Sequence, residues 1–203
     1  MNFNLSDTDL QRCSEDFLFF CDTFGIPLFD WQREAFGNAT RRVNGKFLHP
    51  LGAISVPRGN GKSYGAGAVG SGRLIFGKPP QDVLSVALDT DGARVVMAHA
   101  EKILRSHPVL EGLCESKTDS ILVPSTGSIW RVKSRDHTSS RGLHPDVILY
   151  DEVGWAKDDE LFSSLCASQA SVADPLFLVV STVGRRKVGP LWTIKSLAEG
   201  AAA

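Results

Sequence analysis

The feature that most constrains the fold is an apolar run, Leu51–Val56, that leads into a glycine-rich turn and then into a helical stretch. Apolar runs without alternation are typical of strands that are buried on both faces of a parallel sheet. The turn reads Pro57-Arg58-Gly59-Asn60-Gly61-Lys62-Ser63. A turn of this composition, placed between a buried strand and a helix, indicates a Walker A loop, which binds nucleotide phosphates.

The residue types in this turn suit phosphate and Mg²⁺. Gly59 and Gly61 allow backbone N–H groups to approach phosphate oxygens closely, and the start of the helix adds partial positive charge. We expect Lys62 to reach the β- and γ-phosphates and the Ser63 hydroxyl to ligate Mg²⁺. The general pattern has glycine where this chain has Val56. The turn alone therefore leaves open a glycine-rich connection that contains Lys-Ser by chance.

A second apolar run, Val147–Tyr150, ends in the two acids Asp151 and Glu152, which is the form of a Walker B strand. We expect Asp151 to hold Mg²⁺ and Glu152 to polarise the attacking water as a general base. Both motifs follow buried strands, and ligands of open α/β sheets bind at the carboxyl ends of the strands. No Asn-Lys-x-Asp guanine reader is present. The two motifs together predict an ATPase with ATP and Mg²⁺ as its ligands.

The rest of the chain alternates strand and helix patterns. Further buried strands are predicted at 83–88 and 176–181, a hairpin at 121–133, and helices at 7–24, 31–43, 62–76, 90–105 and 159–171. This order predicts an α/β fold with a mainly parallel central sheet, helices on both faces and added antiparallel strands. With an acid pair ending the Walker B strand, we interpret it as a P-loop NTPase of the ASCE type.

Length and composition indicate a single ATPase domain. The chain has 203 residues, of which 42% are apolar, enough to fill one sizeable core. We divide it into N-terminal helices with an adenine motif (1–45), the P-loop core (46–184) and the start of a lid or linker (185–203). The four cysteines lack CxxC spacing, which favours free thiols over a zinc site. Without a signal peptide or a membrane-spanning run, we expect a soluble cytoplasmic protein with no membrane partner.

Two further segments fit a nucleotide site. Gln32 could hydrogen-bond the adenine edge while Trp31 or Phe29 packs on the ring, although Trp31 could equally anchor its helix in the core. The strand at 176–181 ends in Ser181-Thr182-Val183-Gly184. Hydroxyl groups at that end would face the γ-phosphate and could transmit its hydrolysis, but a plain strand-to-loop turn has the same composition.

Taken together, these motifs resemble the ATPase domain of the large terminase subunit, the DNA-packaging motor of tailed phages. The resemblance spans roughly 29–184 and includes the segment Ser140-Arg141-Gly142-Leu143-His144-Pro145-Asp146 before the Walker B strand. Terminases often lack the first Walker A glycine and carry a basic residue inside the loop. Val56 and Arg58 therefore fit this family better than the general pattern.

The resemblance implies roles and partners. Arg141 matches an arginine finger that acts on the neighbouring subunit, with Arg58 as a rival for a finger or sensor role. Ser181 and Thr182, with Gly184 after them, match the coupling motif. The family acts in the host cytoplasm as a ring of copies, commonly a pentamer, around double-stranded DNA, with the portal and a small terminase subunit as partners. Full-length terminases also carry a nuclease domain, which we expect to be absent from these residues.

Two other functions remain open from the sequence. A superfamily 2 helicase shares a glutamine motif and an Asp-Glu pair, but it needs a second RecA-like domain, and here Val153-Gly154 follow the acids. A nucleotide-dependent assembly module would bind ATP and barely hydrolyse it, which retention of Lys62 and Glu152 argues against.

Contact with DNA would have to come from local basic clusters, because the net charge is −1. Three candidates are Arg41-Arg42-Lys46, Arg131-Lys133-Arg135 and Arg185-Arg186-Lys187. Each could contact phosphates without reading bases, and each alone could equally be a solvated charged face.

Overall fold

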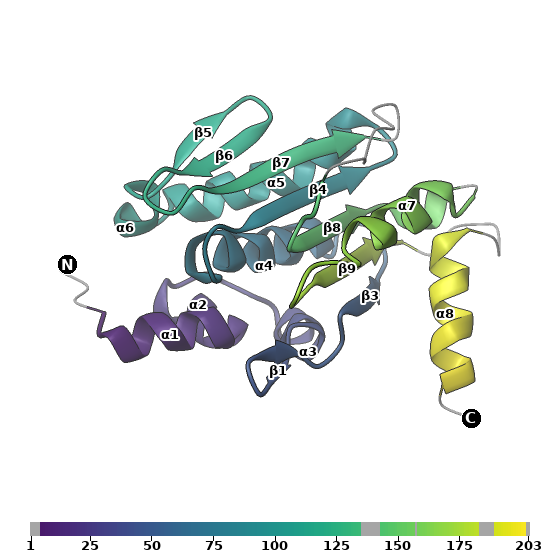
Figure 1. The fold of residues 1–203 in the computed structure, drawn as a ribbon, viewed down its shortest axis with the longest axis horizontal. Helices are drawn as coiled ribbons and strands as arrows, with labels where there is room; N and C mark the ends of the chain where they lie inside the picture. Colours follow the sequence, from purple (N-terminus) through teal and green to yellow (C-terminus); the bar gives the residue numbers. More distant parts are fainter. Residues whose placement is uncertain (1–4, 135–142, 157, 183–188, 202–203) are drawn as a thin grey trace.

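In the computed structural model, which describes residues 5–134, 143–156, 158–182 and 189–201, seven strands form the central sheet in the order β3-β9-β8-β4-β7-β6-β5 (Figure 1). These strands are β3 (Leu51–Ser55), β4 (Asp82–Ala87), β5 (Glu115–Lys117), β6 (Ser120–Val123), β7 (Ser128–Ser134), β8 (Val147–Asp151) and β9 (Leu176–Ser181). Neighbours from β3 to β7 are parallel, whereas β6 pairs antiparallel with β7 and β5. The predicted mainly parallel sheet with added antiparallel strands is confirmed.

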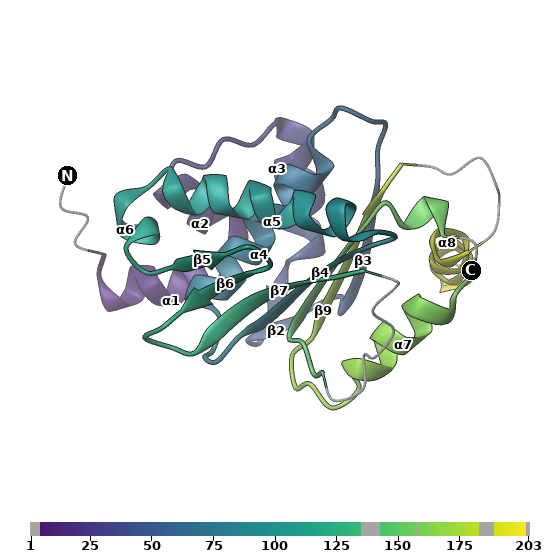
Figure 2. The same ribbon diagram turned by 90° about the horizontal axis from the view of Figure 1, so that it is seen from above.

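Helices cover both faces of this sheet (Figure 2). One face carries α4 and α5, with α1, α2 and α3 packed against α4, and the opposite face carries α7 and α8. The helices are α1 (Asp7–Glu15), α2 (Phe17–Thr23), α3 (Asp30–Ala39), α4 (Lys62–Phe76), α5 (Thr90–Arg105), α6 (Pro108–Glu111), α7 (Glu160–Ser168) and α8 (Pro190–Ala201), with a short 3-10 helix, η1 (Val153–Trp155).

Alternation along the inner strands explains why both faces are apolar. Leu149 of β8 packs in the cluster under α4 and α5, whereas its neighbours Ile148 and Tyr150 pack in the cluster under α7 and α8. Helix α4 lies very close to the sheet, because a Cβ atom at Gly70 would lie 2.3 Å from the Trp130 ring. Because the strands are covered by helices on both faces, their polar residues lie at the carboxyl ends of the strands. In open α/β sheets this edge is where ligands bind.

The predicted first helix is wrong as a single element. It is divided at Asp16, whose carboxylate accepts hydrogen bonds from the N–H groups of Leu18 and Phe19, each at 3.0 Å. This side-chain cap starts α2 as a separate helix, because a capped N-terminus satisfies donors that a continuous helix would bond internally. Apolar periodicity alone does not reveal such a break.

The predicted second helix, 31–43, is too long at its end. It ends at Ala39, and Arg42–Val43 instead forms β1, which pairs antiparallel with β2 (Lys46–Phe47). The turn between them is Asn44-Gly45, with φ angles of 53° and 75°. Two consecutive positive φ values are typical of a tight hairpin turn, so local turn chemistry overrides the helical pattern.

Among the described helices, none is both long and apolar enough to cross a bilayer. Besides β1 and β2, the elements α6, β5, η1 and α8 were not predicted. The free cysteines are Cys13, Cys21, Cys114 and Cys166.

Candidate active site

The P-loop lies between the end of β3 and the start of α4, at the carboxyl edge of the sheet. Gly59 and Gly61 have φ angles of 81° and 76°, a left-handed region that strongly favours glycine. The Asn60 side-chain amide donates to the carbonyl groups of Pro57 and Arg58 at 3.1 Å and 3.4 Å. The turn therefore has a definite shape held by its own residues, as phosphate binding requires.

The two motifs meet across the sheet edge. Lys62 Nζ lies 2.8 Å from Glu152 Oε1, and Ser63 Oγ donates to Asp151 Oδ2 at 2.5 Å. These contacts follow from the strand order, because β3 and β8 run parallel and end on the same edge with β9 between them. The four residues predicted for phosphate, Mg²⁺ and base chemistry are thus brought together.

The oxygen atoms of this cluster suit Mg²⁺. A hard cation of this size takes oxygen ligands and keeps several waters, so a hydroxyl and one carboxylate are an adequate protein contribution. The Ser63 hydroxyl and the Asp151 carboxylate already lie within hydrogen-bond distance of each other. The donor set therefore fits the predicted ion.

Asp151 lies in an unusual environment for a carboxylate. Its exposed fraction is 3%, and burial raises its pKa, while the hydrogen bond from Ser63 and the charge of Lys62 act in the opposite direction. A carboxyl whose pKa is raised on folding weakens the folded state above that pKa, and this penalty disappears as the pH falls below the unfolded value. Keeping this predicted metal ligand ionised therefore lowers the stability of the folded protein.

Asp151→Asn is therefore expected to stabilise the free protein at neutral pH while removing its stabilisation by Mg-ATP. In a domain of this size about 1 kcal/mol of stability corresponds to about 2–4 °C, so removal of the penalty should be seen as a rise of the thermal midpoint. Thermal unfolding of both proteins, with and without Mg-ATP, measures both effects, and Asp91→Asn at an exposed carboxylate is the control. The gain should shrink as the pH falls toward 4. A lower midpoint in Asp151→Asn at pH 7 would contradict the argument.

The end of β9 contacts the Walker B residues directly. Ser181 Oγ accepts from the Gly154 N–H at 2.8 Å and donates to the Thr182 carbonyl at 2.8 Å. Thr182 Oγ1 donates to Glu152 Oε2 at 3.2 Å. Of the predicted coupling residues, Thr182 thus reaches the predicted base, whereas Ser181 bonds the backbone of Gly154 just after it; their coupling role stays a prediction. Gly184 and Arg141 lie outside the described residues.

Gln32 joins the N-terminal helices to the P-loop. Its exposed fraction is only 1%; its Oε1 accepts from the Phe29 N–H and its Nε2 donates to the Gly61 carbonyl, both at 2.8 Å. Trp31 packs toward Phe36, with ring centroids 6.2 Å apart, whereas Phe29 is 65% exposed beside Gly61. The core-anchor alternative for Trp31 agrees with this packing. Contact of Trp31 and Gln32 with adenine stays a prediction.

Sequence reasoning missed Trp155 of η1. Its indole N–H donates to Thr182 Oγ1 at 3.3 Å, and the guanidinium carbon of Arg58 lies 5.8 Å from the centroid of its ring. The only signal in the sequence is an aromatic residue shortly after the Walker B acids. Its partners come from two other segments of the chain.

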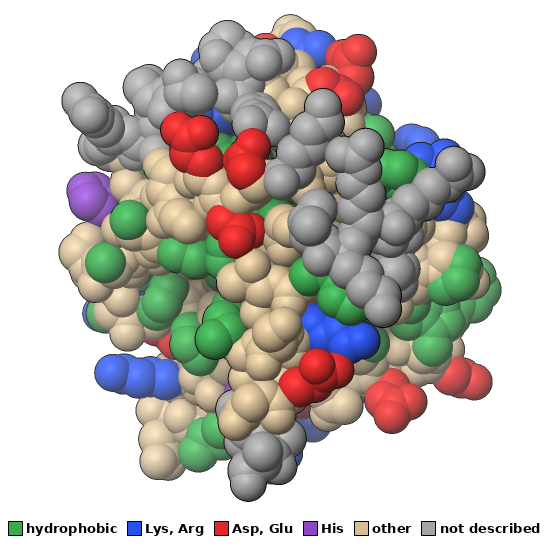
Figure 3. Space-filling view, turned by 90° about the vertical axis from the view of Figure 1, so that its right-hand side faces the viewer, with side chains coloured by type: hydrophobic (Ala, Val, Ile, Leu, Met, Phe, Trp, Pro, Cys, Tyr) green, Lys and Arg blue, Asp and Glu red, His purple; other side chains and the backbone are tan. Residues whose placement is uncertain are grey.

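Two of the predicted basic clusters are partly engaged within the fold. Arg42 pairs with Asp174 at 2.5 Å and lies over the Phe47 ring, and Arg131 pairs with Asp82 at 3.4 Å. The third cluster, 185–187, and Arg135 lie outside the described residues. Figure 3 views the edge toward which the parallel strands point, where acidic and basic side chains of the described residues are interspersed.

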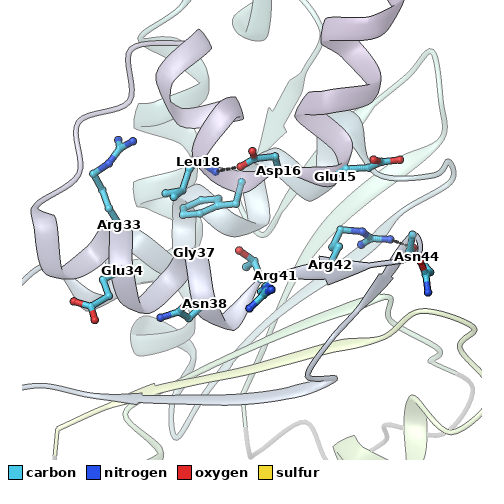
Figure 4. Close-up of a pocket in the computed structure, with 13 residues that line it drawn as sticks. Glu15, Asp16, Leu18, Arg33, Glu34, Gly37, Asn38, Arg41, Arg42 and Asn44 are labelled. Atoms are coloured by element: carbon cyan, nitrogen blue, oxygen red, sulfur yellow. Dashed lines mark hydrogen bonds between the residues drawn. The ribbon is translucent and has the colours of Figure 1, made fainter.

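A cavity of about 540 Å³ lies between the N-terminal helices and β1, and none of the residues predicted for the nucleotide or Mg²⁺ lines it (Figure 4). Three of its charged lining residues serve the fold: Arg33 pairs with Asp22, Arg42 pairs with Asp174, and Asp16 caps α2. The chemistry of the P-loop edge, rather than the size of this cavity, therefore decides where the functional site is.

Comparisons with known proteins agree with this site. A family model described as "Terminase large subunit, ATPase domain" matches residues 28–196. The crystal structure of the HK97 bacteriophage large terminase superposes with a TM-score of 0.73 at 19% identity, covering 86% of this chain and 38% of that one. No curated protein matches the chain.

The ATPase domain of the Thermus phage P74-26 large terminase superposes with a TM-score of 0.63 at 21% identity, covering 81% of this chain and 68% of that one. An arginine-to-alanine mutant of the same domain gives 0.63 at 19% identity with the same coverage. At these identities the likeness shows the fold, and it confirms the predicted ASCE-type P-loop architecture. This chain spans 38% of the HK97 terminase chain.

Proposed function

Because the chain belongs to the family of terminase large-subunit ATPase domains, we propose that it hydrolyses Mg-ATP to move double-stranded viral DNA into a procapsid. The observation that carries this proposal is the meeting of Lys62 and Ser63 with Asp151 and Glu152 at one edge of the sheet. Membership of this family decides against the helicase alternative. The assembly-module alternative differs only in turnover and is separated by experiment.

Binding of ATP would rest on the P-loop. Its glycines expose backbone N–H groups to the phosphates, and Lys62 would turn from Glu152 to the β- and γ-phosphate oxygens. Ser63 and Asp151 would hold the Mg²⁺ ion, which neutralises phosphate charge when bound. Arg58, exposed on the same loop, would act as a sensor of the bound phosphates.

Hydrolysis would use Glu152 as the general base. With Lys62 drawn to the phosphates, Glu152 Oε1 would be released to accept a proton from the attacking water. The other oxygen, Oε2, would remain hydrogen-bonded to Thr182 at the end of β9. Loss of the γ-phosphate would then be sensed at β9, which supports the coupling role of Ser181 and Thr182.

Translocation would require an assembly. We propose a ring of copies, commonly five in this family, around the duplex in the host cytoplasm, with the portal and a small terminase subunit as partners. In that ring Arg141 would complete the neighbouring ATP site. Contacts to DNA phosphates would rest on the local basic clusters, and contacts that are weak in one subunit would add up around the ring. The N-terminal helices, P-loop core and terminal segment with α8 would form one ATPase unit.

The direct test is release of phosphate from Mg-ATP with and without duplex DNA, for wild type, Lys62→Ala and the surface control Lys102→Ala. We expect hydrolysis that duplex DNA stimulates at low salt, an activity loss of about 10²-fold or more in Lys62→Ala, and no change in the control, because an oriented cation that stabilises the phosphoryl transition state contributes several kcal/mol. Hydrolysis that survives Lys62→Ala would contradict the site. ATP binding without any turnover, even with DNA at high protein concentration, would favour the assembly module.

A further inference from the structure

Trp155 is connected to the predicted base by a two-step hydrogen-bond chain. Its indole N–H donates to Thr182 Oγ1 at 3.3 Å, and Thr182 Oγ1 donates to Glu152 Oε2 at 3.2 Å. The three residues come from η1, from the position after β9 and from the end of β8. The backbone N–H of Trp155 donates to the Glu152 carbonyl at 3.1 Å, whereas the indole reaches the Glu152 carboxylate only through the threonine hydroxyl.

The chemistry of the three groups gives this hydrogen-bond chain a single direction, from the indole donor to the carboxylate acceptor. An indole N–H only donates and a carboxylate only accepts, whereas a hydroxyl carries a single proton and can do both. In the structure the Thr182 oxygen accepts from Trp155 through one lone pair and directs its single proton at Glu152. The bond from the tryptophan therefore favours the hydroxyl orientation that binds the carboxylate.

The backbone around Trp155 is well anchored. Glu152 adopts a left-handed conformation, with φ of 57°, and its N–H bonds Asp151 Oδ1 at 2.8 Å and the Val180 carbonyl at 2.9 Å. The Gly154 N–H bonds Ser181 Oγ at 2.8 Å, and Val153 is buried in the cluster that also contains residues of α7 and α8. These hydrogen bonds hold the left-handed turn at Glu152 in place. The side chain of Trp155 therefore lies against Thr182, at the end of β9.

We propose that Trp155 is a positioning residue for the general base, acting through Thr182. The proposal rests on the proposed ATPase function. In the structure Glu152 is bound at Oε1 by Lys62 and at Oε2 by Thr182. Once Lys62 binds phosphate, the bond from Thr182 is the side-chain contact that keeps Glu152 oriented toward the attacking water. Trp155 makes that remaining bond directional.

The ring of Trp155 offers a second contact that must be separated from the first. Arg58 of the P-loop lies over it at 5.8 Å, close enough for a weak cation–π interaction. Phenylalanine keeps a ring for Arg58 and loses the N–H, whereas leucine loses both. Trp155→Phe therefore tests the hydrogen-bond chain alone, and a further loss in Trp155→Leu would report the contact with Arg58.

The kinetic test compares Trp155→Phe, Thr182→Val and Thr182→Ser with wild type, and Trp192→Phe on α8 is the matched control. We expect Trp155→Phe to lower kcat for ATP about tenfold, the usual contribution of one hydrogen bond in a charged network, with KM and the thermal midpoint unchanged. Thr182→Val should lose at least as much, and Thr182→Ser should restore the rate. The double variant Trp155→Phe/Thr182→Val should equal Thr182→Val alone, because both changes break one chain.

A spectroscopic test does not depend on turnover. In ¹⁵N-labelled protein, the indole N–H resonance that Trp155→Phe removes should move and exchange faster with solvent in Thr182→Val, and should be retained in Thr182→Ser. An unmoved resonance overturns the proposal, as does wild-type kcat in Trp155→Phe or a change confined to KM or stability. Absence of hydrolysis in wild type, with the resonance behaving as expected, would instead overturn the proposed ATPase function.

Discussion

Glu152→Gln is expected to bind ATP as tightly as wild type, or more tightly, and to lose about 10²–10⁴-fold in hydrolysis, the usual range for general base catalysis. Binding rests on Lys62 and the P-loop, whereas the amide cannot accept the proton of the attacking water. The substitution also removes the ion pair in which Glu152 holds Lys62 at 2.8 Å, so the lysine is freer to meet phosphate. Titration with ATP and single-turnover hydrolysis measure the two effects separately.

The control for this variant is Glu101→Gln on α5, which neutralises a carboxylate far along the chain from either motif. It should leave both binding and hydrolysis at wild-type values. If Glu152→Gln lost ATP binding in parallel with hydrolysis, Glu152 would belong to the binding machinery. Its assignment as the base would then be wrong.

Arg141→Ala is expected to reduce hydrolysis by about 10³–10⁵-fold in an assembled ring, because an arginine finger stabilises the charge of the phosphoryl transition state. Donation from a neighbouring subunit would also make the wild-type rate per subunit climb with protein concentration. Steady-state hydrolysis measured across a concentration series, with and without duplex DNA, tests both statements. Arg58→Ala tests the rival finger, and Arg105→Ala on α5 is the surface control.

A mixing experiment decides whether the finger acts in trans. Arg141→Ala keeps an intact ATP site, and Glu152→Gln keeps an intact finger, so a mixture of two inactive proteins should regain activity. Recovery that depends on the proportion of the two would support a ring with shared sites. A wild-type rate that is flat with concentration and indifferent to Arg141 would leave an ATPase that works as a single subunit, and the motor proposal would lose its main support.

Short segments of sequence were enough to identify the ATP-binding motifs, because their chemistry is local. The Leu51–Val56 run, the glycines at 59 and 61 and the acid pair at 151–152 each act through the strand or turn that contains them. A buried apolar run followed by a polar motif predicts a strand that ends at a ligand-binding edge in almost any open α/β fold. The family resemblance rests on the same local features, and the family match confirms it.

Local chemistry also explains where sequence reasoning went wrong. Asp16 divides the first helix, and Asn44-Gly45 closes a hairpin in the predicted end of the second. Both signals are visible in the sequence, but each competes with an apolar period that runs through it. The side-chain cap at Asp16 and the tight turn at Asn44-Gly45 outweigh the helical apolar pattern, because each lets nearby backbone groups form hydrogen bonds outside a continuous helix.

The contacts between motifs were decided only by the tertiary structure. Lys62 meets Glu152 across 90 positions of sequence, and Gln32 bonds the Gly61 carbonyl across 29. The chain from Trp155 through Thr182 to Glu152 exists because β9 lies beside β8, with Val180 opposite Asp151. Many strand orders satisfy the same apolar pattern, and side-chain contacts need atoms placed within about 0.5 Å. Sequence alone therefore named the candidate reacting groups, whereas strand order and register determined which of them touch.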